Sequence, residues 1–303
     1  MARVLVTGGA GFLGSHLVDR LVELGHDVTC WDNLSTGSIK NINKKVLRYF
    51  HKVDLKDFNA LEMAAHSCTF DFVFHLASQI NLRDSFANPH NDAQNNILGT
   101  LNLLRVIKMH NSKVIFASTG GAIYSPKEKI PWNEDHAAIP ESPYGISKLS
   151  VENYLRVLAP NSAILRLANV YGPRQNAHGE AGVVAIFLEK ILKNEHIKIF
   201  GNGLQTRDFV YVDDVVDAFV MAMLPDLTGI YNVSTGERTD VETIAKQLIR
   251  LTKKDNTVIE IHPAIKGELK HSALNHHKIT ARYGWRPKTA LYNGLRKTVD
   301  YYL

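Results

Sequence analysis

The sequence has few cysteines and no long uninterrupted apolar run, and each absence excludes a class of protein. Its 303 residues contain two cysteines, Cys30 and Cys68, both in apolar surroundings. Two such thiols argue against a disulfide framework or a zinc cluster and favour a reducing cytosol. No apolar stretch approaches the roughly 20 residues of a membrane span, and the first residues lack a signal-peptide pattern. We therefore expect a cytoplasmic protein that does not associate with membranes.

Histidines and charges are spread along the chain without clustering. None of the 14 histidines belongs to a His-x-x-x-His pair, and no Cys-x-x-Cys occurs, so we expect no metal site. Counting 35 Lys+Arg against 30 Asp+Glu gives a net charge of +5 and a pI near 9.0. Because these charges form no stripe and no RNP-like motif, they indicate a mildly basic surface or a binder of small phosphorylated ligands. We expect no nucleic-acid partner.

The first half of the chain alternates short apolar runs with helical patterns. Apolar residues at 12, 13, 17, 21 and 24 follow helical spacing. A second helical stretch covers roughly residues 90–110, and a third starts at Ser142-Pro143 and is expected to end at Pro160. The apolar runs are typical of strands buried on both faces of a parallel sheet, and they lie at 3–7, 27–31, 71–77, 113–118 and 163–167. This order predicts an α/β fold with a Rossmann-type doubly wound parallel sheet.

The character of the sequence changes after residue 168. Residues 171–182 are rich in Gly, Pro and polar residues, which is typical of a long loop, and helical patterns follow at 183–192, 213–224 and 241–251. We expect residues 1–168 to form the Rossmann domain, with a later excursion around 209–234 that returns to its sheet. Residues 169–303 are expected to form most of a smaller C-terminal domain that binds the substrate.

A glycine-rich turn joins the first predicted strand to the first predicted helix. It contains Gly8, Gly11 and Gly14, and Asp32 ends the next strand. In this context the pattern indicates a dinucleotide site, because the glycines allow the turn, the approach of a pyrophosphate and helix–strand packing. The alternative is a tight turn without a ligand. The Asp32 carboxylate is placed to bind the adenosine ribose hydroxyls and would repel a 2′-phosphate, so we expect NAD rather than NADP.

Tyr144 and Lys148 are four residues apart and share a face of the third predicted helix. A free phenol, with a pKa of about 10, is too weakly ionised to act as a base at neutral pH. A neighbouring ammonium and a positive nicotinamide ring favour the phenolate. Lys148 is also placed to hydrogen-bond the nicotinamide ribose. Ser118 and Thr119 end the strand expected beside this helix, so their hydroxyls are candidates to share a substrate proton with Tyr144.

Together these motifs resemble the NAD-dependent epimerase/dehydratase family of extended short-chain dehydrogenases/reductases, and within it the UDP-glucose 4-epimerase type. The segments that carry the resemblance are 7–14, 32–37, 75–78, 96–100, 118–124, 142–148, 165–175, 179–184, 207–214 and 284–287. The resemblance implies an isomerase that epimerises C4 of a nucleotide sugar, UDP-glucose or UDP-galactose. Tyr144 then takes the 4-hydroxyl proton while NAD accepts the C4 hydride, and the 4-keto sugar turns over before the hydride returns. Ser272, at the position that gates the sugar pocket in this family, is small and implies that UDP-GlcNAc and UDP-GalNAc are accepted too.

The resemblance also implies the remaining site residues. The catalytic group is expected to consist of Tyr144, Lys148, Thr119 and Ser118. Cofactor binding is expected at Gly8, Gly11, Phe12, Leu13, Gly14, Asp32, Asn33, Thr36, Gly37, Asp54, Leu55, Leu76, Ala77, Ser78, Asn96, Ser118, Tyr144 and Lys148. Substrate binding is expected at Thr119, Tyr144, Val183 and Ser272, with Asn169 and Arg207 at the nucleoside diphosphate and Lys198 and Phe200 at the uracil.

One segment departs from the family pattern. Ile265 stands where the family has an arginine for the diphosphate, and Glu268 stands where it has an aspartate. Lys266 is the candidate to supply the missing charge, as a point charge rather than a bidentate fork. We expect this departure to affect the affinity for UDP-sugars.

Other functions are compatible with parts of the pattern. The sugar 4,6-dehydratases carry an acidic pair after the catalytic Thr, whereas Gly120 and Gly121 follow Thr119 here, which argues against dehydration. A UDP-glucuronate 4-epimerase or an NDP-sugar reductase would use the same catalytic residues. A non-catalytic NAD-binding sensor usually loses the Tyr or the Lys, and both are present in this chain.

Members of this family commonly dimerise through the helix near residues 90–110 and the helix that carries the catalytic Tyr. We therefore expect a homodimer. The apolar residues available for such a contact, which are equally able to face the chain's own core, are Leu98, Leu101, Leu104, Tyr154, Leu155 and Leu158.

Overall fold

The computed structural model describes residues 1–66, 68–107, 111–177, 182–263 and 269–303. These residues form two compact units, each assembled from three stretches of chain. Unit 1 comprises Met1–Ser125, Ala137–Arg166 and Val216–Tyr231, and unit 2 comprises Pro126–His136, Leu167–Val215 and Asn232–Leu303. The departures Ile265, Lys266 and Glu268, and residues 179–181 of one expected motif, lie outside the described residues.

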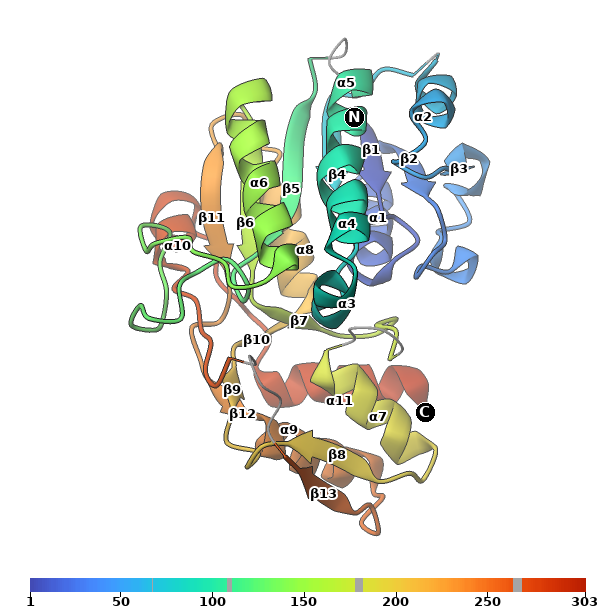
Figure 1. The fold of residues 1–303 in the computed structure, drawn as a ribbon. Coiled ribbons are helices and arrows are strands. Elements are labelled where there is room, and N and C mark those ends of the chain that lie inside the picture. The colour runs from blue at the N-terminus through green and yellow to red at the C-terminus, as the bar shows by residue number, and fades with distance from the viewer. Residues whose placement is uncertain (67, 108–110, 178–181, 264–268) are drawn as a thin grey trace. The chain divides into compact units, whose positions relative to one another are not determined.

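A seven-stranded sheet with the order β11-β6-β5-β4-β1-β2-β3 is the centre of unit 1 (Figure 1). Its strands are β1 (Arg3–Thr7), β2 (Asp27–Asp32), β3 (Phe50–Lys52), β4 (Phe72–His75), β5 (Lys113–Thr119), β6 (Ala163–Leu167) and β11 (Gly229–Val233). β1 pairs in parallel with β2 and β4, β2 with β3, and β4 with β5. The strand order reverses between β1 and β4, as in a Rossmann fold, so the predicted fold class is confirmed.

Helices cover both faces of this sheet because its strands are apolar on both faces. They include α1 (Phe12–Glu23), α2 (Phe58–Ala65), α5 (Gly99–Ile107), α6 (Pro143–Leu158) and α8 (Val212–Met221). In β4, Val73 joins a buried cluster that also contains Leu103 of α5 and Val151 of α6. The next residue, Phe74, packs on Phe219 of α8, with ring centroids 6.2 Å apart. Figure 1 accordingly shows α5 and α6 on one face of the sheet and α1 and α8 on the other.

The helical stretch predicted near residues 90–110 consists of several short helical segments. α3 (Leu82–Ala87) and α4 (Pro89–Ala93) precede a π-helical turn (Gln94–Leu98) that leads into α5. The side chain of Asn88 caps α4 by accepting a hydrogen bond from the Asn91 N–H at 3.0 Å. Single π-helical turns of this kind are frequent at functional sites. Two 3₁₀ turns, Ile39–Asn41 and Leu47–Tyr49, lie between β2 and β3.

Unit 2 is made of short strand pairs and helices. The strand pairs are β7 (Asn169–Tyr171) with β10 (Phe209–Tyr211) and β8 (Ile197–Phe200) with β13 (Ile259–His262), both parallel, and β9 (Thr206–Arg207) with β12 (Thr239–Asp240), antiparallel. The helices are α7 (Val183–Leu192), α9 (Val241–Thr252), α10 (His277–Tyr283) and α11 (Leu291–Tyr302). Within the part of the chain that the structure describes, no helix combines the length and apolarity that a membrane span requires.

Candidate active site

The turn between β1 and α1 is so tight that a side chain does not fit at Gly8 or Gly14. Gly8 has a φ of +73°, and a methyl group there would lie 2.7 Å from the Ala77 N. A methyl group on Gly14 would lie 2.0 Å from the Gly8 O. Gly11 is the N-cap of α1 and has no side chain to cap the first-turn amides, so these N–H groups and the helix dipole are a candidate anion site. The first two residues of this helix, both half-buried, are Phe12 and Leu13.

Asp32 ends β2 and is bonded to the backbone of the same turn. Its Oδ2 accepts a hydrogen bond from the Ala10 N–H at 2.9 Å, and its Oδ1 accepts one from the Leu34 N–H at 2.7 Å. Burial raises the pKa of the Asp32 carboxyl, and the two backbone donors oppose that shift. Each carboxylate oxygen has a second lone pair with which it can accept a hydrogen bond from a ribose hydroxyl. Gly37 packs against this turn, since a methyl group on it would lie 2.8 Å from the Ala10 carbonyl carbon.

Other residues predicted to hold the adenosine follow β2 and β3. Asn33 Nδ2 donates to Asp54 Oδ2 at 3.1 Å. Leu55 is buried, and its carbonyl accepts a hydrogen bond from Asn102 Nδ2 at 2.9 Å. The structure therefore brings Asn33, Asp54 and Leu55 into one region, and Thr36 is exposed in the loop after β2.

The loop after β4 is shaped by Asn96 of the π-helical turn. The Asn96 Oδ1 accepts hydrogen bonds from Ser78 Oγ and the Gln79 N–H, each at 2.8 Å, and its Nδ2 donates to the Gln79 O at 3.0 Å. The Ala77 N–H donates to Thr7 Oγ1 at 3.3 Å. The predicted cofactor residues 76–78 and Asn96 are thus brought together, and Asn96 uses its amide group to hold the loop.

His75, the last residue of β4, is bonded on both ring nitrogens. Its Nδ1 lies 2.8 Å from Thr7 Oγ1, and its Nε2 lies 2.8 Å from Thr100 Oγ1. Thr100 donates its single hydroxyl proton to the Asn96 O at 2.6 Å, so the proton on His75 must be on Nε2, and Thr7 must donate to Nδ1. Complete burial lowers the pKa of His75 to about 3, so the ring is neutral. Sequence reasoning missed this role, because only membership of the motif 75–78 marked the residue.

The start of α6 is determined by residues around Tyr144. Ser142 is the N-cap, and its Oγ accepts a hydrogen bond from the Gly145 N–H at 3.1 Å. A methyl group on Gly145 would lie 2.2 Å from the Ala122 O, so glycine lets the helix approach the segment that follows β5. The helix ends at Leu158, two residues before Pro160, as its sequence predicts.

Lys148 is buried beneath the ring of Tyr144. Its Nζ donates to the Ala117 O of β5 at 3.0 Å and lies 5.8 Å from the centroid of the Tyr144 ring. Burial lowers the pKa of Lys148 to about 7, and the carboxylates of Asp92 and Glu152 oppose that shift. The predicted pair therefore lies together at β5, with an amine that titrates close to neutral pH.

The two hydroxyls at the end of β5 have different surroundings. Ser118 is buried, and its Oγ donates to Glu152 Oε1 at 2.5 Å. Glu152 is in turn held by Arg166, whose Nε donates to Oε1 at 3.0 Å and whose Nη2 donates to Oε2 at 2.7 Å. Thr119 is the last residue of the strand and is only partly buried. Thr119 is therefore the better placed of the two for contact with a ligand, and Ser118 is bonded to the buried ion pair.

In unit 2, β8 presents two of the predicted substrate residues on one face. Ile197 and Ile199 are buried, whereas Lys198 and Phe200 alternate with them and are exposed. The ring of Phe200 lies 5.6 Å from that of His262 on β13, measured between centroids. This alternation places an aromatic ring and an ammonium on the same exposed side of the strand.

Arg207 and Ser272 are joined through Thr206 of β9. The Arg207 Nη1 donates to the Thr206 O at 3.0 Å, and the Ser272 N–H donates to the same oxygen at 3.1 Å. Ser272 is almost fully buried. The remaining predicted substrate residues begin elements of this unit, Asn169 at β7 and Val183 at α7.

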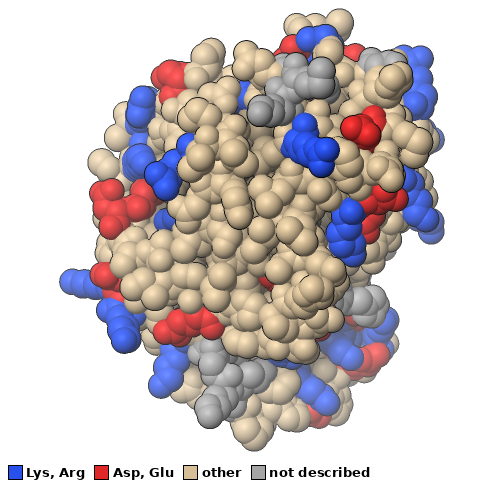
Figure 2. All heavy atoms as spheres, turned by 45° about the horizontal axis from the view of Figure 1, so that its top comes forward, with Lys and Arg blue, Asp and Glu red and all other residues tan. Residues whose placement is uncertain are grey.

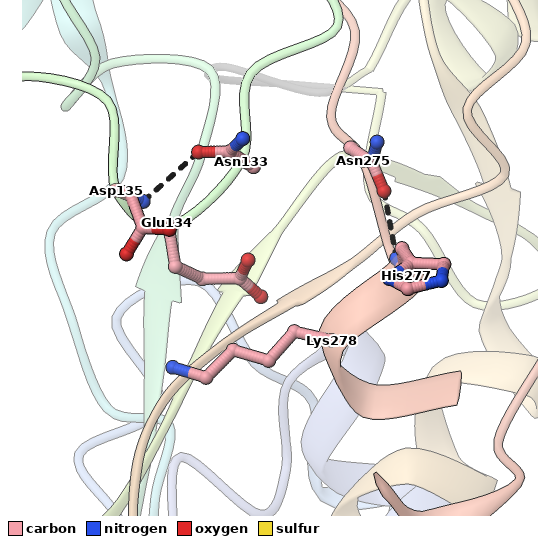
Figure 3. A pocket seen from close by; sticks show the side chains of 6 residues that line it. All are labelled: Asn133, Glu134, Asp135, Asn275, His277 and Lys278. Atoms are coloured by element: carbon pink, nitrogen blue, oxygen red, sulfur yellow. Dashed lines mark hydrogen bonds between the residues drawn. The ribbon is translucent and has the colours of Figure 1, made fainter. Parts of the chain in front are cut away.

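Unit 2 also has an open hollow of about 340 Å³ that the sequence did not predict (Figure 3). It is lined by Asn133, Glu134, Asp135, Asn275, His277 and Lys278. Glu134 already accepts a hydrogen bond from the Asn232 N–H at 2.6 Å, and Asn275 Oδ1 accepts one from the His277 N–H at 2.7 Å. None of the predicted substrate residues lines this hollow.

The fold and these groups define the class of protein. The parts present are a Rossmann sheet, a glycine turn that fits a dinucleotide, an acidic residue at the end of β2, and a Tyr144–Lys148 pair at β5. They are the parts of a short-chain dehydrogenase/reductase that uses NAD.

The chain belongs to the NAD-dependent epimerase/dehydratase family, whose family model matches residues 4–234. It is 39% identical to the UDP-glucose 4-epimerase of Mycolicibacterium smegmatis, over 99% of this chain and 98% of that one. It is similar to the crystal structure of Thermotoga maritima UDP-glucose 4-epimerase with UDP-glucose, at 43% identity and a TM-score of 0.93. It is also similar to the NAD complex of the Thermus thermophilus enzyme, at 40% identity and a TM-score of 0.92. Each structure is matched over 99% of this chain and 98% of the other.

These findings confirm the class predicted from the sequence. The chain is an NAD-dependent enzyme of the extended short-chain dehydrogenase/reductase type and an isomerase of nucleotide sugars that resembles UDP-glucose 4-epimerase.

Proposed function

We propose that this chain interconverts UDP-glucose and UDP-galactose by epimerisation at C4. The observation that carries the proposal is the buried Lys148 amine beneath the ring of Tyr144, on a helix packed at β5. A cation in this position favours the phenolate and so provides a base for a sugar hydroxyl. The similarity to UDP-glucose 4-epimerases, one of them crystallised with UDP-glucose, supports the choice of substrate.

The residues of unit 1 fit NAD. We assign the pyrophosphate to the first-turn amides of α1, the adenosine ribose to Asp32, and the adenine region to Asp54 and Leu55. The loop 76–78 and Lys148 are assigned to the nicotinamide half. NAD, when bound, supplies the hydride acceptor at C4 and then the hydride donor for the return step.

The proposed proton transfer runs through Tyr144. Its phenolate oxygen takes the proton of the C4 hydroxyl and later returns a proton to the oxygen of the 4-keto sugar. The Lys148 ammonium stabilises the phenolate, and Thr119, partly exposed at the end of β5, shares the proton. Ser118 does not exchange a proton with the substrate in this scheme, because its hydroxyl donates a hydrogen bond to Glu152.

The predicted substrate residues of unit 2 are proposed to hold the nucleotide sugar during this reaction. We assign the uracil to Phe200 and Lys198 on the exposed face of β8, and the diphosphate to Arg207 and Asn169. Val183 and Ser272 are assigned to the sugar. Exposed aromatic and cationic groups suit a uracil ring and its phosphates.

A panel of nucleotide sugars, analysed by product chromatography, tests the proposed function. The panel contains UDP-glucose, UDP-galactose, UDP-GlcNAc, UDP-glucuronate and a 4-keto NDP-sugar with NADH. We expect equilibrium mixtures of the C4 epimers with no net consumption of NADH. Epimerisation confined to UDP-glucuronate, or NADH-dependent reduction of the keto sugar, would assign one of the other activities. A protein that binds NAD and converts no member of the panel would favour a sensor.

Ser272 is proposed to set the tolerance for an N-acetyl group. A small, buried side chain leaves room beside the sugar, so we expect turnover of UDP-GlcNAc as well as UDP-glucose. Ser272→Tyr should lower kcat/KM for UDP-GlcNAc by about tenfold or more relative to UDP-glucose, because the larger side chain takes the room that the N-acetyl group needs and such overpacking costs roughly 1–3 kcal/mol. The measurement is the ratio of the two kcat/KM values, with Ser272→Ala as the control. An unchanged ratio in Ser272→Tyr means that this residue does not gate the pocket.

We propose a homodimer formed through α5, the π-helical turn and α6. Leu98, Tyr154 and Leu158 are exposed, as are Ile146 and Val157, whereas Leu104 and Leu155 face the core. Leu101 is half-buried. Figure 2 shows basic and acidic side chains interspersed on the visible face, with a broad uncharged area in its middle.

Light scattering is expected to give about twice the chain mass of 33.9 kDa. Val157→Glu should produce monomers, because it places a charge at the centre of an apolar contact. Met63→Glu, which changes an equally exposed apolar residue on α2, is the control and should remain dimeric. A monomeric wild-type protein excludes this assembly.

A cytoplasmic location is proposed as well. Cys30 and Cys68 are both free thiols, and burial raises the pKa of Cys30 to about 12. Unpaired cysteines suit a reducing compartment. Cell fractionation with compartment markers tests the location.

A further inference from the structure

A buried carboxylate with no assigned role lies next to α6, the helix that carries Tyr144 and Lys148. Asp92 of α4 is fully buried. Its Oδ1 accepts hydrogen bonds from Gln79 Nε2 at 3.0 Å and from Asn96 Nδ2 at 3.1 Å, and its Oδ2 accepts one from Ser147 Oγ at 2.5 Å. A buried charge persists only where donors or a cation compensate it, and three neutral donors do so here.

These three donors come from two parts of the proposed site. Gln79 and Asn96 belong to the polar network that shapes the loop after β4, where the nicotinamide half of NAD is assigned. Ser147 lies on α6, three residues after Tyr144 and directly before Lys148. Asp92 therefore bonds the loop after β4 (residues 76–79), called here the cofactor loop, to α6 through a single carboxylate.

Hydrogen bonds from neutral groups compensate the charge of Asp92, whereas the charge of Glu152 is paired with a cation. Within the described residues, the charged and titratable groups that interact with Lys148 are Tyr144 and Glu152 on α6, Asp92 on α4, His75 on β4, and Arg166 on β6 through Glu152. His75 is neutral, and Glu152 is neutralised by Arg166 at 2.7 Å. In the described ranges no Lys or Arg forms an ion pair with Asp92. Asp92 thus supplies the net negative charge near Lys148.

We propose that Asp92 is a positioning residue for the catalytic pair, which locks α6 to the cofactor loop and holds Lys148 in its ammonium form. A buried amine loses its proton readily unless an anion stands near it. Lys148 is such an amine, because burial lowers its pKa to about 7 and Asp92 is the first of the two carboxylates that oppose the shift. The inference rests on the proposed roles of Tyr144 and Lys148.

The test is the pH profile of kcat for Asp92→Asn, Asp92→Glu and Ser147→Ala, each purified with NAD. Asp92→Asn removes the charge and should move the alkaline limb about one unit towards lower pH, with a fall in kcat of about tenfold above that limb. Asp92→Glu keeps the charge and should return the limb to its wild-type position. Ser147→Ala keeps the charge and loses one hydrogen bond, so kcat should fall a few-fold while the limb stays in place or moves to higher pH.

Several outcomes would overturn the inference. One is an Asp92→Asn enzyme with the wild-type alkaline limb, and another is an Asp92→Glu enzyme that shares the shifted limb of Asp92→Asn. If Asp92→Asn does not fold, Ser147→Ala decides, because a shift of its limb to lower pH contradicts a charge effect of Asp92. Failure of the proposed function is distinguishable, since Tyr144→Phe would then retain turnover. If Tyr144→Phe is inactive and the limbs do not move, only the role of Asp92 is wrong.

Discussion

Replacing Tyr144 with phenylalanine is expected to lower kcat by roughly 10²- to 10⁴-fold, the contribution of a positioned general base. The variant keeps the aromatic ring and removes only the oxygen that is proposed to exchange a proton with the C4 hydroxyl. The side chain is half-buried, so the loss of one hydroxyl should change the free energy of unfolding by no more than about 1 kcal/mol. The measurements are kcat with UDP-galactose, the amount of NAD retained on purification, and the unfolding midpoint.

A matched control lies on the same helix. Tyr154 is an exposed tyrosine of α6, and Tyr154→Phe should leave kcat within about twofold of the wild type. NAD content should be the same in both variants and in the wild type. Retention of more than about a tenth of the wild-type kcat in Tyr144→Phe would mean that another group is the base.

Replacing Arg166 with methionine is expected to lower the free energy of unfolding by about 3–5 kcal/mol, since it leaves a buried carboxylate without its partner. Arg166 and Glu152 each have 3% of their side-chain surface exposed and are joined by two hydrogen bonds. Among the residues that the structure describes, Glu152 would then keep the hydroxyl of Ser118 as its hydrogen-bond donor. Denaturant unfolding without added NAD measures the change, because bound NAD would add stability of its own.

Two further variants test whether the loss of stability comes from an unpaired charge in a buried position. Removing both charges, in Glu152→Met with Arg166→Met, should recover most of the stability, because no buried ion is left unpaired. Arg20→Met breaks an exposed pair with Glu23, whose closest atoms are 3.5 Å apart, and should cost less than about 1 kcal/mol. Equal losses in Arg166→Met and Arg20→Met would contradict the argument.

Local patterns predicted most of unit 1. The strands β1, β4 and β5 are short apolar runs, and a nearly continuous apolar run is typical of a strand that is buried on both faces. The glycine turn was predictable for a similar reason, since Gly8 requires a positive φ and Gly14 touches the Gly8 backbone. Both requirements arise within a few residues of chain, which is the range over which sequence patterns are informative.

Contacts between distant segments were not predictable in the same way. Ser118 and Thr119 are adjacent and equivalent in sequence, yet Ser118 donates its hydroxyl to Glu152, 34 residues away. Asp92 and His75 gave no local signal of their buried networks. In each case the hydrogen-bond partner depends on how α6 or β4 packs against other elements. That packing cannot be deduced from local patterns in a single sequence.

The residues proposed for a dimer contact were predicted less clearly for the same reason. Leu155 and Leu158 are separated by less than one helical turn, and both fit an apolar stripe. Leu155 is fully buried and Leu158 is 57% exposed, so the stripe is wider than the core contact. Helical spacing marks such a stripe but does not divide it between the chain's own core and a second molecule.

The hydrogen bonds around His75 run in one direction only. From the Ala77 N–H through Thr7, His75 and Thr100, each member donates to the next and the last donates to the Asn96 carbonyl. The direction is fixed because the Asn96 carbonyl has no proton to give. Thr7 and Thr100 must therefore act as acceptor on one side and donor on the other, and valine, although of the same shape, offers neither. The unfolded chain binds a proton at histidine below a pKa of about 6.5, whereas folded His75 does so only near 3. Between those values the unfolded state holds the extra proton, so acidification lowers the stability of unit 1 through the end of β4, where the loop proposed to hold the cofactor begins.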